Sequence, residues 1–330
     1  MANRSEVVVV TGAGAGLGRA IACAFARRGA SIGLVARGRE RLEAARREVE
    51  QLGGRGLVLT GDVADPSTTE QAAARTEEAF GPIDVWVNNA MTTVFSPVAE
   101  MTPEDYRRVT EVTYLGFVYG TLAALKRMRA RDKGSIVQVG SALAYRSIPL
   151  QSAYCAAKHA MLGFTDSLRT ELIHDRSPVR VTVVQMPAIN TPQFGWSKSR
   201  MPRTAQPVPP IFQPEVCAEA VYWAAHRDHR EVFVGGPTLR AIWGQRLVPG
   251  VADHLAAPAW EAQLTGQPED PDRPNNLYTP VEADVGAHGA FDAQAAWSSL
   301  EFDLTRRGSS VLSAAKYLTR MALRSTPRRR

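Results

Sequence analysis

The sequence predicts an α/β fold in which a doubly wound parallel sheet carries helices on both faces, followed by a C-terminal extension. Short apolar runs rich in β-branched residues alternate with longer amphipathic segments from residue 6 to residue 234. Glycines follow the first apolar run directly, as expected where a buried parallel strand turns into a helix. With 330 residues, of which 45% are hydrophobic and 22% charged, the chain can bury a large core.

The predicted strands are short apolar runs that end at glycine or at polar residues. In chain order they cover residues 6–11, 31–36, 55–60, 83–89, 134–140, 179–185 and 228–234. The first contains four consecutive valines, which is typical of a strand buried on both faces.

The predicted helices repeat apolar residues at intervals of three and four. They cover residues 19–28, 40–52, 67–80, 103–131 and 152–175. Gly29 ends the first helix, and Gly53 and Gly54 end the second. Because a helix separates most pairs of successive strands, we expect the strands to be parallel.

Two later regions interrupt this alternation. Residues 187–214 contain seven prolines, so they cannot form a central strand or an uninterrupted helix. They follow the sixth strand at the ligand end of the sheet, and we interpret them as a lid over a substrate. Residues 249–330 begin with loops rich in proline and aspartate. We therefore divide the chain into a main domain, 1–248, and a C-terminal extension, 249–330.

The charge of the chain is concentrated at one end. The net charge is +6, and residues 306–330 contain basic residues but no acidic ones. This end is either a solvated helix with an Arg-rich terminus or a basic amphipathic helix at 308–324. Such a helix would contact an anionic membrane or pack on the core or at a subunit interface. Nucleic-acid binding is disfavoured, because the charge is terminal and lacks an element that reads bases.

Further features of the sequence limit where the protein is located and which chemistry it uses. The sequence has no apolar run near 18 residues and no signal-peptide pattern at its N-terminus. Its three cysteines are scattered, which argues against a disulfide framework. Its six histidines lack the spacing of metal ligands. We therefore expect a cytoplasmic protein that uses no metal in its chemistry.

A phosphate-binding turn is predicted at residues 11–18, which read Thr-Gly-Ala-Gly-Ala-Gly-Leu-Gly. Glycines let the backbone approach a pyrophosphate, and the following helix N-terminus offers free N–H groups. The second strand ends at Ala36, Arg37 follows, and the first carboxylate after the glycine turn is Glu40. NAD calls for an acidic residue here and NADP for positive charge, so the sequence predicts NADP(H). The alternative is that Arg37 and Arg39 only begin a solvated helix.

Ser141, Tyr154 and Lys158 form the candidate catalytic group. A tyrosine hydroxyl titrates near pH 10, too high for efficient proton transfer at neutral pH. Lys158 lies one helical turn after Tyr154, where its ammonium can stabilise the phenolate. Ser141, at the end of the fifth strand, can hold a substrate oxygen. These groups suit hydride chemistry at a carbonyl or alcohol carbon.

Over roughly residues 5–240 the chain resembles the short-chain dehydrogenases/reductases. The resemblance rests on the glycine turn at 11–18, on Asp62-Val63 and Asn88-Asn-Ala90, and on Ser141 with Tyr154-x-x-x-Lys158. It implies a Rossmann-type fold and an oxidoreductase in which Tyr154 is the general acid/base. It also implies a dimer or tetramer. The cofactor contacts that we predict are Gly12, Gly14, Ala15, Gly16, Leu17, Gly18, Arg37, Asp62, Val63, Asn89, Ala90, Tyr154, Lys158, Pro187, Ile189 and Thr191.

The chain departs from the family pattern at three positions. Met91 and Ala188 stand where the family has glycine. Thr113 replaces the asparagine that links the lysine to solvent through a water, and we include it among the catalytic candidates as part of a modified proton relay. These departures leave an alternative open, namely a weakly catalytic protein that senses NADP(H).

The substrate is expected to be an apolar alcohol or ketone. The residues that we predict to contact it are mostly apolar or aromatic: Met91, Thr93, Leu143, Tyr145, Phe194 and Trp196.

Overall fold

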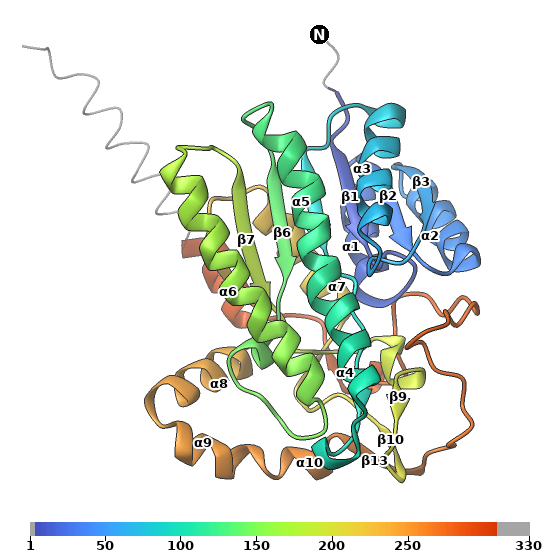
Figure 1. The fold of residues 1–330 in the computed structure, drawn as a ribbon, viewed down its shortest axis with the longest axis vertical. Coiled ribbons are helices and arrows are strands. Elements are labelled where there is room, and N and C mark those ends of the chain that lie inside the picture. Colours follow the sequence, from blue (N-terminus) through green and yellow to red (C-terminus); the bar gives the residue numbers. More distant parts are fainter. Residues whose placement is uncertain (1–3, 309–330) are drawn as a thin grey trace, which may run out of the picture.

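The computed structural model describes residues 4–308, which fold around a seven-stranded parallel sheet with helices on both faces (Figure 1). The strand order is β12-β7-β6-β4-β1-β2-β3. Every pairing within this sheet is parallel. The predicted doubly wound sheet is therefore confirmed.

The strands of the sheet lie close to their predicted ranges. They are β1 (Val7–Thr11), β2 (Ser31–Ala36), β3 (Arg55–Thr60), β4 (Val85–Asn88), β6 (Ser135–Val139), β7 (Arg180–Gln185) and β12 (Glu231–Phe233). The helices that cover the sheet are α1 (Gly16–Ala26), α2 (Arg39–Gln51), α3 (Pro66–Phe80), α4 (Pro103–Thr110), α5 (Gly116–Arg129), α6 (Ser152–His174) and α7 (Pro214–Ala225).

The four valines of β1 show how the sheet is buried on both faces. Val8 and Val10 belong to one apolar cluster, whereas Val7 and Val9 belong to another on the opposite face. All four side chains are fully buried. Alternating side chains point to opposite faces of a strand, so a continuous apolar run is the pattern that two covered faces require.

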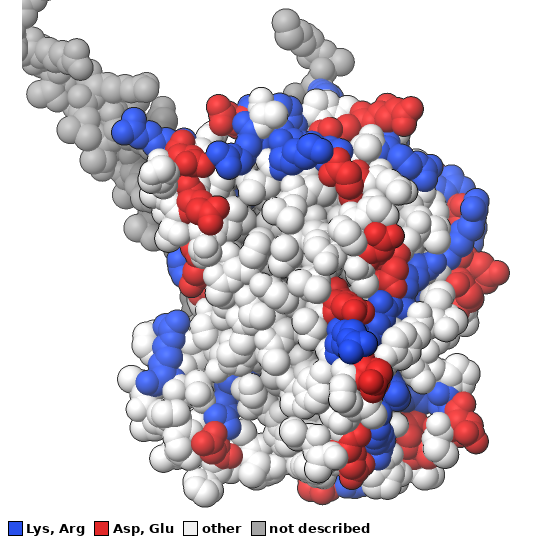
Figure 2. Space-filling view, in the orientation of Figure 1, with Lys and Arg blue, Asp and Glu red and all other residues white. Residues whose placement is uncertain are grey.

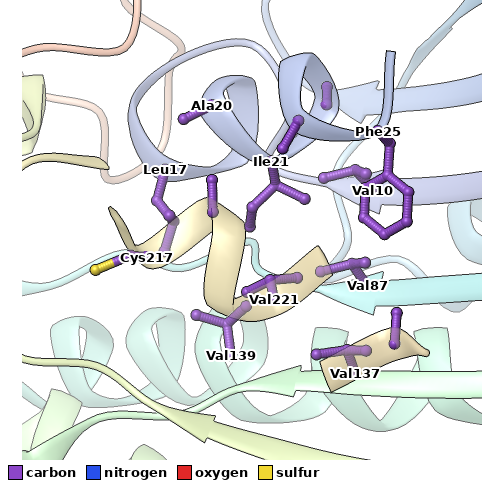
Figure 3. Packing of buried hydrophobic residues seen from close by; sticks show 14 of the residues in the cluster. Val10, Leu17, Ala20, Ile21, Phe25, Val87, Val137, Val139, Cys217 and Val221 are labelled. Atoms are coloured by element: carbon purple, nitrogen blue, oxygen red, sulfur yellow. The ribbon is translucent and has the colours of Figure 1, made fainter. Parts of the chain in front are cut away.

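Helix α7 was missing from the predicted elements. Its first residue, Pro214, belongs to the proline-rich stretch that we interpreted as a lid. Proline is tolerated in the first helical turn because no intrahelical bond uses its missing N–H. In Figure 3, Val221 of α7 lies between Ile21 of α1 and the strand residues Val87 and Val139. The helix therefore completes one face of the core.

The predicted helix at 103–131 is interrupted. A π-helical turn at Glu111–Leu115 separates α4 from α5. Such turns are rare and occur mostly at functional sites. This one contains Thr113, the residue that replaces the family asparagine.

The predicted lid at 187–214 and the C-terminal extension are joined by strand pairing beyond the carboxyl ends of the sheet (Figure 1). Here β10 (Arg203–Ala205) pairs with β13 (Leu264–Pro268), and β11 (Ile211–Phe212) pairs with β14 (Ala295–Ala296). β11 also pairs with β8 (Ala188–Ile189). The short strands β5 (Val94–Phe95) and β9 (Lys198–Ser199) pair in the same region. The lid and the extension therefore form a connected layer at the ligand end.

The extension begins with helical structure where loops were expected. After α8 (Gly236–Leu247) come α9 (Pro249–Ala256) and α10 (Ala259–Ala262). Most of the predicted basic helix at 308–324 lies outside the described residues. Within residues 4–308, no helix combines the length and the apolar character needed to cross a membrane.

Candidate active site

A cleft of about 410 Å³ opens at the carboxyl ends of β1, β4 and β6, where the strand order reverses. Ligands of open parallel sheets bind at such a switch point. All sixteen residues predicted to contact the cofactor line this cleft. So does Ser141. Residues from seven separate segments of the predicted main domain thus meet in one place.

The glycine turn packs tightly against the loop that follows β4. A Cβ at Gly12 would lie 2.9 Å from the Cα of Ala90, and Gly12 has a φ of +70°, which favours glycine. Thr11 Oγ1 accepts hydrogen bonds from the N–H groups of Asn89 and Ala90, at 2.9 and 3.1 Å. The turn after β1 and the loop after β4 are therefore held together as one backbone cradle.

Ser141, Tyr154 and Lys158 converge on the wall of the cleft. Ser141 follows β6, and its N–H donates to Gln185 Oε1 at 2.9 Å, which fixes the strand end. The Ser141 hydroxyl acts on the Tyr154 phenol in the direction that lowers its pKa. Lys158 Nζ lies 5.6 Å from the centroid of the Tyr154 ring and donates to the carbonyl of Val139 at 2.7 Å. The predicted catalytic group is thus assembled.

Burial governs the titration of this group. It raises the pKa of the Tyr154 phenol above its ordinary value of 10, and the Ser141 hydroxyl opposes that increase. Burial also lowers the pKa of Lys158 to about 8. Lys158 is only 3% exposed, so its charged form is poorly solvated. Its ammonium is therefore predominant at neutral pH and is lost in mildly alkaline solution.

Thr113 lies outside the cleft lining. Its Oγ1 accepts a hydrogen bond from the N–H of Thr92 at 3.0 Å and donates one to the carbonyl of Thr92 at 2.9 Å. Both Thr113 and Thr92 are buried. The hydroxyl therefore holds the π-helical turn to the loop after β4. This contact supports the cofactor loop, whereas the predicted relay role stays a prediction.

The two arginines considered for the cofactor phosphate differ in position. Arg39 is exposed and does not line the cleft. Arg37 lines it, but its guanidinium donates to the backbone carbonyls of Asn276, Leu277 and Tyr278. Asn276 itself lines the cleft. A residue of the C-terminal extension thus reaches the cofactor end of the site.

Arg41 is a cleft residue that the sequence analysis missed. It is 9% exposed, and its guanidinium carbon lies 4.8 Å from the centroid of the Trp196 ring. Its Nε is buried without a hydrogen-bond partner among the described residues. Burial lowers the pKa of Arg41, and the carboxylates of Glu282 and Asp284 oppose that shift. Arg41 lies in the first turn of α2, whereas Arg37 precedes the helix and its extended N-cap residue Gly38, so their spacing in the sequence did not place them side by side.

Several of the residues predicted to contact the substrate line the cleft, namely Met91, Leu143, Phe194 and Trp196. Trp196 lies at the arginine end, against Arg41. Thr93 is buried and does not line the cleft. Tyr145 also lies elsewhere, and its hydroxyl donates to Glu231. Lining residues that were not predicted include Ile148, Gln151, Gln206, Pro207, Val208, Pro209, Pro210, Thr238 and Ala241.

The switch-point cleft, the glycine cradle and the Ser–Tyr–Lys group define a nucleotide-dependent oxidoreductase. The family described as short chain dehydrogenase matches residues 6–201, more than half of the chain. The protein therefore belongs to the short-chain dehydrogenase/reductase family, whose cofactor is of the NAD(P) type.

Individual relatives cover different shares of the chain. An uncharacterized oxidoreductase, YxnA of Bacillus subtilis (strain 168), is 31% identical over 290 residues, covering 86% of this chain and 80% of its own. Dehydrogenase/reductase SDR family member 7B of Mus musculus is 38% identical over 192 residues, 57% of this chain and 59% of its own.

One solved structure gives a further comparison. The alcohol dehydrogenase from the archaeon Thermococcus sibiricus, complexed with 5-hydroxy-NADP, matches with a TM-score of 0.60 and 30% identity. The match covers 70% of this chain and 96% of that one. A substantial part of this chain therefore has no counterpart in that enzyme.

Proposed function

We propose that this protein is an NADP(H)-dependent oxidoreductase that reduces a carbonyl, or oxidises an alcohol, of an apolar small molecule. The observation that carries the proposal is that Ser141, Tyr154 and Lys158 line the same cleft as the glycine turn. A substrate in this cleft would thus lie near both a proton donor and a bound nucleotide.

The residues of the cleft divide the chemistry between them. A bound NADPH would supply the hydride. Ser141 holds the substrate oxygen by a hydrogen bond. Tyr154 gives its proton to that oxygen as negative charge develops on it, and in the oxidation direction the phenolate takes the proton back. The ammonium of Lys158 stabilises the phenolate electrostatically.

The preference for NADP(H) is supported by positive charge at the end of β2. Arg37 and Arg41 both line the cleft. The buried Nε of Arg41 lacks a hydrogen-bond partner within residues 4–308, and a phosphate oxygen would supply one. Gly38 lies between them, and a Cβ there would lie 3.1 Å from Glu282 Oε2 and 3.2 Å from Arg41 Nε. A side chain at position 38 would therefore crowd the Arg41 guanidinium.

The direct test is oxidation of NADPH in the presence of apolar ketones, aldehydes and quinones, with NADH in parallel. We expect turnover with at least one class and a higher kcat/KM for NADPH. Cofactor binding without turnover of any carbonyl or alcohol would favour the sensor alternative. Equal or better use of NADH would refute the cofactor preference.

We also propose that the protein forms a dimer or tetramer through α5 and α6. Figure 2 shows few charges on the face formed by these helices, whereas charges gather along its upper and right-hand edges. Leu122 of α5 and Ile173 of α6 expose 54% and 76% of their surface. Light scattering coupled to size-exclusion chromatography tests the proposal, because a monomer mass at micromolar concentration would contradict it.

A further inference from the structure

A segment of the C-terminal extension joins the two sides of the cofactor cleft. We call residues 276–292 the C-terminal strap. The strap lies beyond residues 6–201, the part of the chain that matches the family. One side of the cleft consists of the glycine turn, α1 and the end of β2, and we call it the first bank. The other consists of the loop after β7, and we call it the second bank.

The strap is attached to the first bank near the end of β2. Arg37 Nη1 donates to the carbonyls of Leu277 and Tyr278, at 3.3 and 2.9 Å. Arg108 Nε donates to the same Leu277 carbonyl at 2.9 Å. Leu277 is fully buried. This end of the strap is therefore anchored by charge-assisted bonds around an apolar side chain.

A second attachment is made to the glycine turn itself. The N–H of Gly16 donates to the carbonyl of Gly286 at 3.0 Å. Arg19, in the first turns of α1, forms an ion pair with Asp284. The Arg19 side chain is 9% exposed and that of Asp284 is 43% exposed. The strap thus contacts the turn that would face a pyrophosphate.

The far end of the strap is attached to the second bank. Asn190 is fully buried, and its Oδ1 accepts from the N–H of Phe291 at 3.0 Å while its Nδ2 donates to Asp292 at 2.7 Å. The N–H of Gly289 donates to the Asn190 carbonyl at 3.3 Å. A Cβ on Gly289 would lie 2.5 Å from the carbonyl oxygen of Thr191. The strap therefore fits against the residues next to Thr191 only with glycine at this position.

These attachments hold the two banks close together. A Cβ added at Gly16 would lie 3.3 Å from the Cβ of Thr191, which is closer than an ordinary van der Waals contact, so glycine at this position allows the two banks to approach each other. Gly16 and Thr191 are both predicted to contact the cofactor. The strap is bonded directly to Gly16, and it is bonded to Asn190, the residue before Thr191. Within a few residues the strap passes from Gly286, bonded to the first bank, to Gly289, bonded to the second, so a dinucleotide that enters or leaves between the banks at this point must pass a segment bonded to both.

We propose that the C-terminal strap gates cofactor exchange: NADP(H) enters and leaves the cleft when the strap detaches from the second bank. The inference rests on the proposed function, because it takes the cleft to be the cofactor site. A gate of this kind has a kinetic signature. Loosening it speeds both association and dissociation, and it changes the equilibrium constant much less.

The test is stopped-flow measurement of NADPH binding, followed by energy transfer from tryptophan to the nicotinamide. Gly289→Ala places a methyl group against the Thr191 carbonyl and weakens the attachment to the second bank. Gly266→Ala is the matched control, because a Cβ there meets no heavy atom within 4 Å. We expect Gly289→Ala to raise both rate constants about tenfold, as loss of one or two hydrogen bonds permits, and to leave Kd within about threefold.

Two outcomes would overturn the gate. Unchanged rate constants in Gly289→Ala would show that the strap does not limit exchange. A faster dissociation with an unchanged association rate, and hence a proportionally weaker Kd, would show that the strap is only part of the binding surface.

A second pair of variants acts on another attachment to the second bank and guards against misfolding of the first. Asp292→Asn weakens the hydrogen bond that Asn190 Nδ2 donates to this carboxylate and is expected to raise both rate constants in the same way. Asp272→Asn is its control, because Asp272 is exposed and its carboxylate makes no hydrogen bond or ion pair within the described chain. If the wild-type protein binds neither NADPH nor NADH, the proposed function fails. If it binds and the rates of both strap variants equal those of their controls, only the gate fails.

Discussion

The two ends of the cleft are built in different ways. At the catalytic end, Tyr154 and Lys158 lie one turn apart on α6, and Ser141 comes from the preceding strand. At the other end, Arg37 and Arg41 meet the backbone and the carboxylates of a segment about 240 residues later in the chain. The three catalytic candidates therefore lie close together in the sequence, whereas the arginine end of the cleft depends on the C-terminal strap.

The difference has an electrostatic consequence. The catalytic end is buried, and the charge of Lys158 is opposed by desolvation alone. The arginine end is also partly desolvated, but Glu282 and Asp284 face Arg41 and favour its charged form. A variant at the catalytic end should thus alter turnover, and a variant at the arginine end should alter which cofactor binds.

The largest effect is expected for Tyr154→Phe. Loss of the general acid should reduce kcat by about 10³-fold or more, because positioned proton transfer contributes roughly 10²–10⁴. The Kd for NADPH should change little, since the ring and its packing remain. Steady-state kinetics and fluorescence titration measure the two quantities separately. Residual activity near that of the wild type would remove Tyr154 from the mechanism.

The catalytic end was predictable because its residues lie close together in the sequence. Helical spacing places Tyr154 and Lys158 on one face, and the end of a predicted strand supplies Ser141. The valines of β1 likewise predicted a strand buried on both faces. The fold and this half of the site follow from periodicity and from motifs that occupy neighbouring positions in the chain.

The arginine end was predictable only in part. The sequence indicated positive charge after β2, but nothing in it showed that Arg37 would be occupied by carbonyls of residues 276–278. A backbone carbonyl has no sequence signature. Arg39 and Arg41 could be distinguished only once α2 had a defined direction relative to the cleft. Tyr145 was misplaced for a similar reason, because its partner Glu231 belongs to a distant strand.

Lys158 offers a test of burial at the catalytic end. Its pKa is lowered from 10.5 to about 8, so between these pH values the unfolded chain binds a proton that the folded chain has lost. The free energy of unfolding therefore rises with pH across this interval. We expect wild type to gain stability relative to Lys158→Met between pH 8 and pH 10.5 in urea denaturation. Parallel stability curves for the two proteins would contradict the lowered pKa.

Arg41→Gln tests the arginine end. Replacing a charged partner of the 2′-phosphate should raise KM for NADPH about tenfold or more, because hydrogen bonds to charged groups contribute roughly 1.5–3 kcal/mol. KM for NADH should change much less, since it lacks that phosphate. Arg39→Gln is the matched control, because Arg39 is exposed outside the cleft. Equal effects on both cofactors would assign Arg41 to packing against Trp196.

The smallest effect on catalysis is expected at Thr113, which supports the loop after β4 and belongs to neither end of the cleft. Thr113→Val keeps the shape but removes the hydroxyl that bonds both backbone groups of Thr92. Two buried polar groups would lose their partner, which costs about 1–3 kcal/mol for each group left unsatisfied. We expect a lower midpoint of denaturation, with kcat reduced only a few-fold because Ser141, Tyr154 and Lys158 do not contact this hydroxyl.

Thr113→Asn distinguishes support from proton relay at the same position. An amide is longer than the threonine hydroxyl, so it should disturb the bonds to Thr92 and lower stability as well. If Thr113 is part of a relay, the asparagine should nevertheless raise kcat, because it restores the family residue. If the hydroxyl only holds the loop after β4, kcat should stay the same or fall together with stability. A change of kcat in the direction opposite to stability is therefore the result that would assign Thr113 to proton transfer.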